Sequence, residues 1–108
     1  MATRASAPYI AAKHAVIGLT RAAAAEYGDQ GIRVNALVVG RTRTAMTTQP
    51  APENPADRAT APASRPAPVI QDRYADPAEV AEAARWLCSP ASSFVTGSAM
   101  AVDGGRTA

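Results

Sequence analysis

Residues 31–40 read Gly-Ile-Arg-Val-Asn-Ala-Leu-Val-Val-Gly, and this stretch decides the fold. It is a short apolar run from Ile32 to Val39 that is rich in β-branched residues, interrupted by Arg33 and Asn35, and bounded by glycines. Runs of this length and composition, closed by turn residues, are typical of a buried strand in a parallel sheet. We therefore predict a buried parallel strand from Ile32 to Val39.

The stretch before this strand has the pattern of a helix. Ser6 is a suitable capping residue, and Pro8 suits a first turn, where a missing backbone N–H costs little. Apolar residues then recur at helical spacing, and Gly28 and Gly31 provide two stop positions. These apolar residues are Ile10, Val16, Ile17, Ala23, Ala24 and Tyr27. We predict a helix over residues 8–28, so that helix, glycine turn and strand form half of a βαβ unit.

A second helix is predicted nearer the carboxyl end. Asp76, Pro77 and Glu79 are typical of a helix start, because together they satisfy the donors of the first turn. Pro90 ends the helix shortly after Cys88, which we expect to be a small buried apolar group. The apolar stripe of this helix is Val80, Ala83, Ala84 and Leu87.

A last short strand is predicted over residues 99–102, followed by a turn at Asp103-Gly-Gly105. The order is then helix, strand, helix, strand. Alternation of this kind predicts the α/β class with a parallel sheet.

Residues 47–75 differ in composition from the rest of the chain. They contain prolines at positions 50, 52, 55, 62, 66 and 68 among Ala, Thr, Ser and Arg, with few apolar anchors. Such a stretch cannot by itself bury enough surface to offset its ordering entropy. Two interpretations stay open, a mobile loop or lid and a plain disordered insertion.

Composition and charge narrow the possible partners. The 108 residues suffice for one small domain, and with 47% hydrophobic but only 5% aromatic residues its core must be built from small and aliphatic side chains. The net charge is +2, and the basic residues are spread along the chain rather than concentrated in a patch. We therefore predict no nucleic-acid partner.

The same inventory bears on compartment and metal binding. Cys88 is the only cysteine, which excludes an internal disulfide and fits a reducing compartment. No apolar run approaches the roughly 20 residues needed to cross a bilayer, and residues 1–7 lack the apolar region of a signal peptide. We expect a soluble, cytoplasmic protein without a membrane partner. Because His14 is the only histidine, we also predict no metal site.

Tyr9 and Lys13 are the candidate catalytic residues. A tyrosine phenol ordinarily has a pKa of about 10, so it exchanges protons near neutrality only where something stabilises the phenolate. Side chains at i and i+4 share a helical face, so the ammonium of Lys13 can lie close enough to Tyr9 to do this. In the alternative interpretation, Tyr9 half-buries its ring with the hydroxyl at the surface, and Lys13 is a solvated helix charge.

Six segments, in this order, resemble the carboxyl-terminal part of a short-chain dehydrogenase/reductase. This is a family of NAD(P)-dependent oxidoreductases built on one Rossmann-type domain. The segments are Tyr9-Ile-Ala-Ala-Lys13-His-Ala-Val-Ile-Gly-Leu-Thr20, Gly31-Ile-Arg-Val-Asn35-Ala, Gly40-Arg-Thr-Arg-Thr44, Asp76-Pro-Ala-Glu-Val80-Ala, Phe94-Val-Thr-Gly97 and Val102-Asp-Gly-Gly105. The resemblance implies an α/β fold with a Rossmann-type doubly wound parallel sheet. Residues 1–108 would supply only its later strands and helices, as the carboxyl-terminal part of a single dinucleotide-binding domain.

The resemblance also implies an activity, the interconversion of a small-molecule carbonyl and a secondary alcohol with NAD or NADP as cofactor. Tyr9 matches the acid/base that exchanges a proton with the substrate oxygen. Lys13 matches the residue that favours the ionised tyrosine and hydrogen-bonds the nicotinamide ribose. Residues 47–75 match the variable substrate-binding segment. The turn and loop that face the nicotinamide and pyrophosphate are matched by Val39, Gly40, Thr42 and Thr44.

The sequence departs from the family pattern in three ways. Only eight residues precede Tyr9, so the family's catalytic serine and assisting asparagine have no counterpart, and Ser6 is better explained as a cap. The Gly-rich phosphate loop and the residue that selects NAD or NADP are also absent. Val39 stands where the family usually has proline.

These departures lead us to expect little or no activity from the isolated chain. The alternative is a catalytically inactive fragment or assembly module. Such a module would retain the elements through which family members form homo-oligomers.

Overall fold

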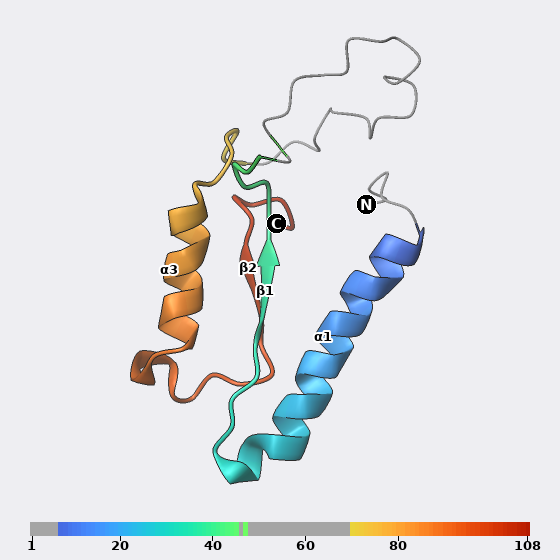
Figure 1. Cartoon of the computed structure of the whole chain (residues 1–108), viewed down its shortest axis with the longest axis vertical. Helices are drawn as coiled ribbons and strands as arrows, with labels where there is room; N and C mark the ends of the chain where they lie inside the picture. The colour runs from blue at the N-terminus through green and yellow to red at the C-terminus, as the bar shows by residue number, and fades with distance from the viewer. Residues whose placement is uncertain (1–6, 46, 48–69) are drawn as a thin grey trace.

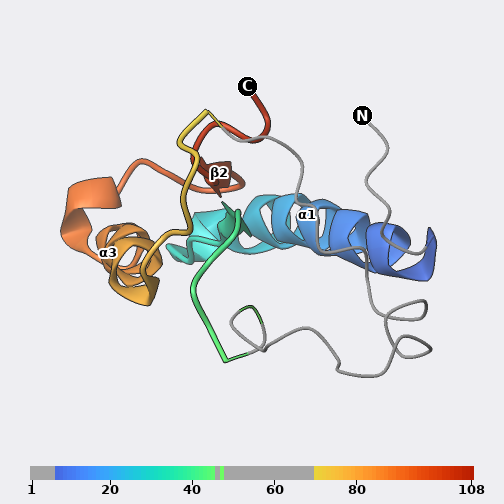
Figure 2. The same cartoon turned by 90° about the horizontal axis from the view of Figure 1, so that it is seen from above.

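The computed structural model describes residues 7–45, 47 and 70–108. Its two helices are α1 (Ala7–Tyr27) and α3 (Pro77–Leu87). Figures 1 and 2 show the two helices on opposite sides of a pair of strands, so the strands form the middle of three layers. This is the layered arrangement of an α/β domain. None of the helices in these described ranges has the length and apolar character needed to cross a bilayer.

The middle layer consists of β1 (Ala36–Val39) and β2 (Ala99–Val102), which pair in parallel. Ala36 lies opposite Ala99, and the register continues without a bulge to Val39 opposite Val102. Parallel strands need a crossover connection, and α3 lies in that connection. The strand predicted over residues 99–102 and the parallel pairing are therefore confirmed.

Helix α1 ends where the glycines predicted. The helix stops at Tyr27, and a single 3₁₀ turn, Gly28–Gln30, follows it. Gly31 then adopts a left-handed conformation with φ of 75°, and its N–H donates to the Gly28 carbonyl at 3.1 Å. Glycine reaches this conformation without steric cost. The helix predicted over residues 8–28 is confirmed to within one residue at each end, while its predicted cap, Ser6, lies outside the described residues.

The strand predicted over residues 32–39 begins later than expected, at Ala36. The residues before it are held largely by side-chain bonds, together with a backbone bond from the Gly97 N–H to the Val34 carbonyl at 2.7 Å. The Asn35 amide donates to the Val95 carbonyl at 2.9 Å and accepts a bond from the Ser98 N–H at 3.0 Å. The Asn35 side chain thus takes the place of backbone bonds between strands, so the extended chain is fixed before regular strand pairing begins.

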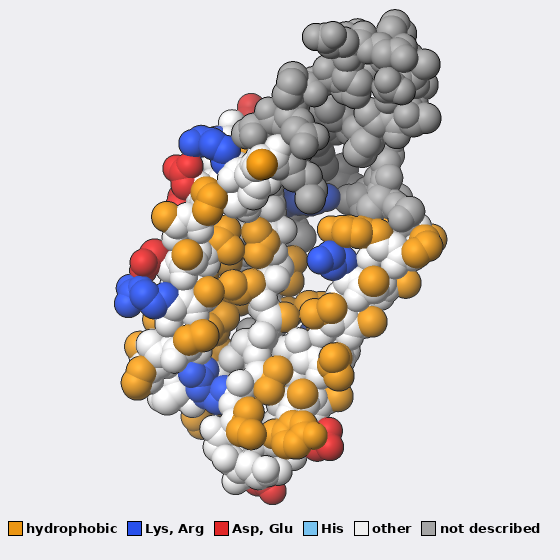
Figure 3. Space-filling view, viewed as in Figure 1, with side chains coloured by type: hydrophobic (Ala, Val, Ile, Leu, Met, Phe, Trp, Pro, Cys, Tyr) orange, Lys and Arg blue, Asp and Glu red, His pale blue; other side chains and the backbone are white. Residues whose placement is uncertain are grey.

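The core is small and built from short side chains. Its buried apolar residues are Ala24 of α1, Ala36 of β1 and Leu87 of α3. The predicted burial of the whole strand is wrong at its carboxyl end, where Val39 is 42% exposed. The reason is that β2 is the only strand paired with β1 in the described part of the chain. Figure 3 accordingly shows hydrophobic side chains at the surface over both helices.

Helix α3 begins as predicted. Glu79 accepts a bond from the Asp76 N–H at 2.8 Å through Oε2, and Pro77 occupies the first helical position. The predicted apolar stripe faces inward, since Val80, Ala83 and Ala84 are half-buried and Leu87 is buried. These local signals were sufficient to find both the start and the inner face of the helix.

The expectation that Cys88 is buried is wrong, because its side chain is exposed. Successive residues of a helix are turned by about 100°, so the position directly after the buried Leu87 points away from the inner face. Ser92 takes the buried position at this end of the helix instead. Its hydroxyl lies 2.9 Å from the carbonyl oxygens of Trp86 and Leu87, which also accept bonds from Ser89 and Arg33, respectively.

Candidate active site

Tyr9 and Lys13 lie one turn apart near the start of α1. The Nζ atom of Lys13 is 5.4 Å from the centroid of the Tyr9 ring and lies over its face, within the range of a cation–π interaction. Tyr9 is 57% exposed, and Lys13 is exposed as well. The structure therefore brings the two predicted side chains together, as their i, i+4 spacing requires. Their chemical role stays a prediction.

The start of α1 lies at the same end of the molecule as the carboxyl ends of β1 and β2 (Figure 1). Ligands of open parallel sheets bind outside the carboxyl ends of the strands. The buried residues of α1, Thr20 and Ala24, are in its second half, and the helix leans away from the strands toward its start. The pair thus faces solvent at the end of the sheet where a ligand is expected.

Gly40 follows β1 directly, and its N–H donates to the Val102 carbonyl at 2.9 Å. A Cβ atom at this position would lie 2.6 Å from the Cα of Asp103 and 2.8 Å from its carbonyl oxygen. Backbone atoms cannot yield as a flexible side chain can, so only glycine fits. The backbone of Asp103 makes this close approach, so the fold itself requires glycine at position 40.

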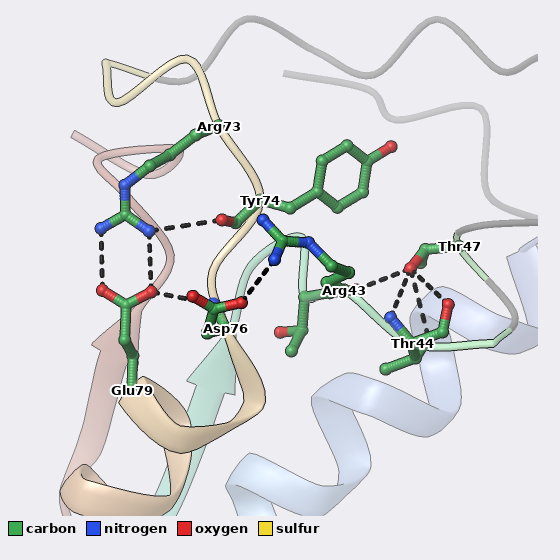
Figure 4. Close-up of polar contacts among 8 residues, drawn as sticks. Arg43, Thr44, Thr47, Arg73, Tyr74, Asp76 and Glu79 are labelled. Atoms are coloured by element: carbon green, nitrogen blue, oxygen red, sulfur yellow. Dashed lines mark hydrogen bonds and ion pairs between the residues drawn. The ribbon is translucent and has the colours of Figure 1, made fainter.

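The loop after Gly40 carries Thr42 and Thr44, and the hydroxyl of Thr47 closes it into a tight turn (Figure 4). That hydroxyl donates toward the Thr42 carbonyl at 2.8 Å and accepts a bond from the Thr44 N–H at 2.8 Å. The Thr44 and Thr47 hydroxyl oxygens are 3.2 Å apart. Thr47 therefore shapes the predicted cofactor loop, a role that the sequence analysis did not assign to it.

Residues 70–76, which we call the returning segment, run beside the loop of residues 40–44, which we call the post-β1 loop. Thr42 and Ala75 form a parallel bridge. The Arg43 N–H donates to the Ala75 carbonyl at 2.9 Å, and the Ala75 N–H donates to the Arg41 carbonyl at 2.8 Å. The two stretches are therefore joined by backbone bonds in the manner of short strands.

Side chains reinforce this junction. Nη1 of Arg43 donates to Oδ1 of Asp76 at 2.8 Å, and the guanidinium of Arg41 lies 5.1 Å from the centroid of the Tyr74 ring. The sequence analysis missed both contacts. No local signal could have found them, because the partners are 33 residues apart in each case and no spacing rule connects them.

Two carboxylates near the ends of the strands have pKa values below their ordinary range. Two hydrogen bonds from Arg73, at 2.7 and 2.8 Å, together with the Asp76 N–H, lower the pKa of Glu79 to about 2. The same pair raises the pKa of Arg73. At the end of β2, the Thr107 hydroxyl and then backbone N–H groups lower the pKa of Asp103. Both carboxylates are committed to holding local structure and remain ionised at neutral pH.

Most of the predicted substrate segment, residues 48–69, lies outside the described residues. Residues 70–75, the last part of that prediction, are tied to the post-β1 loop and, through the Gln71 N–H, to the Gly104 carbonyl at 2.9 Å. Within the described ranges, no three His, Cys, Asp or Glu side chains are grouped so that they could hold a metal ion.

Comparison with known proteins decides the family. The sequence model of a family described as enoyl-(acyl carrier protein) reductase matches residues 1–107. The chain belongs to the short-chain dehydrogenase/reductase family. It is 50% identical over 107 residues to the A-factor type gamma-butyrolactone 1'-reductase (1S-forming) of Streptomyces virginiae, a match that covers 99% of this chain and 40% of that relative.

Solved short-chain dehydrogenases/reductases have the same architecture. The structure of 4-hydroxyisoleucine dehydrogenase complexed with NADH and succinate is 33% identical with a TM-score of 0.73, over 99% of this chain and 41% of that one. A blue fluorescent protein from a metagenomic library, in complex with NADPH, is 31% identical with a TM-score of 0.71, over 93% and 37%. The predicted Rossmann-type fold is confirmed, and the chain spans about two fifths of the length of these relatives.

Proposed function

We propose that this chain carries the proton-transfer pair and part of the nicotinamide site of an NAD(P)-dependent oxidoreductase that interconverts a small-molecule carbonyl and a secondary alcohol. One observation carries the proposal. The ammonium of Lys13 lies 5.4 Å over the ring of Tyr9, at the end of the molecule where the strands present their carboxyl ends. Membership of a family of oxidoreductases supports the reaction class.

In the direction of carbonyl reduction, Tyr9 donates its hydroxyl proton to the substrate oxygen, and a phenolate remains. The positive charge of Lys13 stabilises that phenolate, so the proton leaves more readily than from an isolated phenol. In the reverse direction the phenolate takes the alcohol proton. The exposure of Tyr9 leaves its hydroxyl open to a substrate. When bound, a nicotinamide supplies or accepts the hydride at the substrate carbon.

The side chains around this end of the sheet fit a nicotinamide nucleotide. Lys13 contributes an exposed ammonium, and Thr42 and Thr44 contribute hydroxyls on a loop that Val39 and Gly40 connect to the end of β1. These groups can hydrogen-bond ribose hydroxyls, a carboxamide and phosphate oxygens. In this proposal Lys13 holds the nicotinamide ribose, and the post-β1 loop faces the nicotinamide and the pyrophosphate.

Solved relatives bound to NADH and to NADPH support a nicotinamide cofactor without deciding between NAD and NADP. This chain matches about two fifths of the length of its relatives. In this proposal the family's phosphate-binding glycines and catalytic serine belong to the remaining part of the fold.

Replacing Tyr9 with phenylalanine tests the assigned role. In the full-length protein, Tyr9→Phe should lower kcat by about 10²–10⁴-fold, the usual contribution of a general acid/base. Binding of NADH or NADPH, followed by fluorescence titration, should stay unchanged, because the phenyl ring keeps its face toward Lys13. Tyr27→Phe is the matched control, since Tyr27 is an exposed tyrosine at the other end of the same helix. Near-normal turnover in Tyr9→Phe would contradict the proposal.

Assembly of a homo-oligomer is a second candidate function, and the surface of α1 favours it. Val16 and Leu19 are exposed on this helix, and Phe94 is fully exposed in the loop before β2. Exposed apolar side chains of this size are typical of a surface that packs against another protein surface. Weaker self-association after a polar replacement on α1 would be the signature of this role.

A further inference from the structure

The returning segment has no part in the proton transfer proposed above, yet it is the immediate neighbour of the post-β1 loop. Ala75 bonds to the residues on both sides of Thr42, through the Arg41 carbonyl at 2.8 Å and the Arg43 N–H at 2.9 Å. The backbone path of the two threonines predicted to face the cofactor is therefore fixed from the side by residues more than thirty positions later in the sequence.

Arg43 is the residue between those two threonines, and its side chain makes the strongest side-chain contact of the junction. The guanidinium donates to Asp76 Oδ1 at 2.8 Å, with the Arg43 and Asp76 side chains 60% and 55% exposed (Figure 4). A charge-assisted bond of this length is directional as well as attractive. It fixes the middle of the post-β1 loop to the residue that directly precedes α3.

Asp76 can serve as an anchor because it is itself held. Its N–H donates to Glu79 Oε2 at 2.8 Å, and Glu79 accepts two bonds from Arg73 at 2.7 and 2.8 Å. The chain of contacts thus runs from Arg43 through Asp76 and Glu79 to Arg73, and Figure 4 shows it as one continuous network. A network of charged groups holds its geometry better than an isolated exposed pair.

We infer that Arg43 and Asp76 are positioning residues for the cofactor loop, an inference that rests on the proposed function. Their ion pair holds Thr42 and Thr44 in the arrangement that the nicotinamide nucleotide binds, and neither charged group takes part in proton or hydride transfer. Preorganising a loop raises affinity because less ordering is left to occur on binding. An exposed pair contributes little by itself, so its loss should weaken cofactor binding by only about two- to fivefold.

Two single variants of the full-length protein test this inference. Arg43→Gln and Asp76→Asn each remove one charge, and asparagine remains a good helix cap, so the start of α3 is kept. Each should raise the Kd for NADH or NADPH about two- to fivefold in fluorescence titrations, with kcat changed less than this. Hydrogen exchange at the Arg43 N–H should also become faster, because its acceptor Ala75 is less firmly held.

Arg85→Gln is the matched control. Arg85 pairs with Glu82 at 2.6 Å, with side chains 74% and 65% exposed, and both residues belong to α3. This variant removes a somewhat more exposed ion pair within α3 and should leave the cofactor Kd and loop exchange unchanged. The double variant Arg43→Gln/Asp76→Asn should cost no more than either single variant, because both remove the same contact.

Three results would overturn the inference: an unchanged Kd in both single variants, an equal rise in Arg85→Gln, or additive losses in the double variant. A wild-type protein that binds neither dinucleotide would overturn the proposed function and, with it, the cofactor role of this pair. Hydrogen exchange distinguishes the two failures. It reports whether Arg43 and Asp76 order the post-β1 loop even when no cofactor binds.

Discussion

The first half of α1 and the unit formed by β1, α3 and β2 are held together in different ways. Within the unit, contacts join residues far apart in sequence. The Arg33 guanidinium, for example, donates to the carbonyls of Leu87 at 2.8 Å and Val95 at 3.1 Å. In α1 the buried residues, Thr20 and Ala24, belong to the second half. Its first half is fixed chiefly by its own helical hydrogen bonds.

This difference separates the part of the candidate site that is set by residues near in sequence from the part that depends on distant residues. The separation of Tyr9 and Lys13 is set by one helical turn and needs nothing beyond the helix. Their position relative to the post-β1 loop depends on packing made near Ala24, about four turns further along. The loop itself depends on the returning segment. The geometry of the Tyr9–Lys13 pair is therefore set by the helix alone, whereas the post-β1 loop is held by distant parts of the chain.

The largest effect on stability should come from adding a side chain where the residues after β1 and β2 touch. Gly40→Ala would put a Cβ atom 2.6 Å from the Asp103 Cα, which forces one backbone to move. Overpacking of this kind costs about 1–3 kcal/mol or more in the free energy of unfolding, measured by urea denaturation. Gly18→Ala in α1 is the control, because, beyond its chain neighbours and the backbone of its own helix, no atom of the described residues lies within 4 Å of the added Cβ. Alanine there should stabilise the helix by roughly 1 kcal/mol. Equal stability of the two variants would erase the proposed difference between the regions.

A smaller effect should appear in the pH dependence of stability. The folded-state pKa of Glu79, about 2, lies below the ordinary value of 4.5. Its ionised form is therefore favoured by folding, and this contribution is complete above the ordinary pKa and is lost as pH falls through the folded value. The free energy of unfolding should fall more steeply between about pH 5 and about pH 2 in wild type than in Glu79→Gln.

Asp72→Asn is the control for that measurement. The Asp72 carboxylate is 96% exposed and lies 3.8 Å from the Arg41 guanidinium, a weak contact by comparison. Its loss should leave the slope of stability against pH close to that of wild type. Identical slopes in wild type and Glu79→Gln would mean that the contact network at the start of α3 does not hold in solution.

The smallest effect on stability is expected on the open face of α1. Leu19 is 70% exposed, and Leu19→Gln keeps a residue of similar helix propensity, so the free energy of unfolding should change by less than about 0.5 kcal/mol. Ala24→Leu, at a buried position of the same helix, should instead cost about 1–3 kcal/mol. Sedimentation of Leu19→Gln should show weaker self-association than wild type. An unchanged association constant would remove the support for assembly through this face.

What the sequence could predict follows the same division. The ends of α1, the start of α3 and the proximity of Tyr9 to Lys13 depend on residues within a few positions of each other, and all were found. Val16 was placed on the apolar stripe of α1, yet it is exposed. Thr20 and Ala24 are the buried residues of this helix, and Ile10, Ile17 and Ala23 are half-buried. Periodicity in an alanine-rich helix did not distinguish Val16 from its neighbour Ile17.

Several of the features that could not be predicted depend on distant partners. The late start of β1 follows from bonds between Asn35 and residues 95 and 98, and the pairing of Arg43 with Asp76 crosses 33 positions. The resemblance placed Gly40 in the turn after the strand, but the reason that only glycine fits there, the backbone of Asp103, was not predicted. Charged residues and glycines in the sequence indicate that ion pairs and close backbone approaches exist, but they do not indicate which residues are the partners.

The two tethers that flank residues 48–69 have a practical consequence for protein engineering. On one side the Thr47 hydroxyl closes the turn after β1, and on the other the Gln71 N–H is bonded to Gly104 at 2.9 Å. Because Thr47 and Gln71, on either side of this stretch, are bonded to the loops that follow β1 and β2, the stretch can be exchanged for that of another family member. Such an exchange would test the prediction that this stretch binds the substrate, because substrate preference should then move with it while the strands and α1 stay where they are.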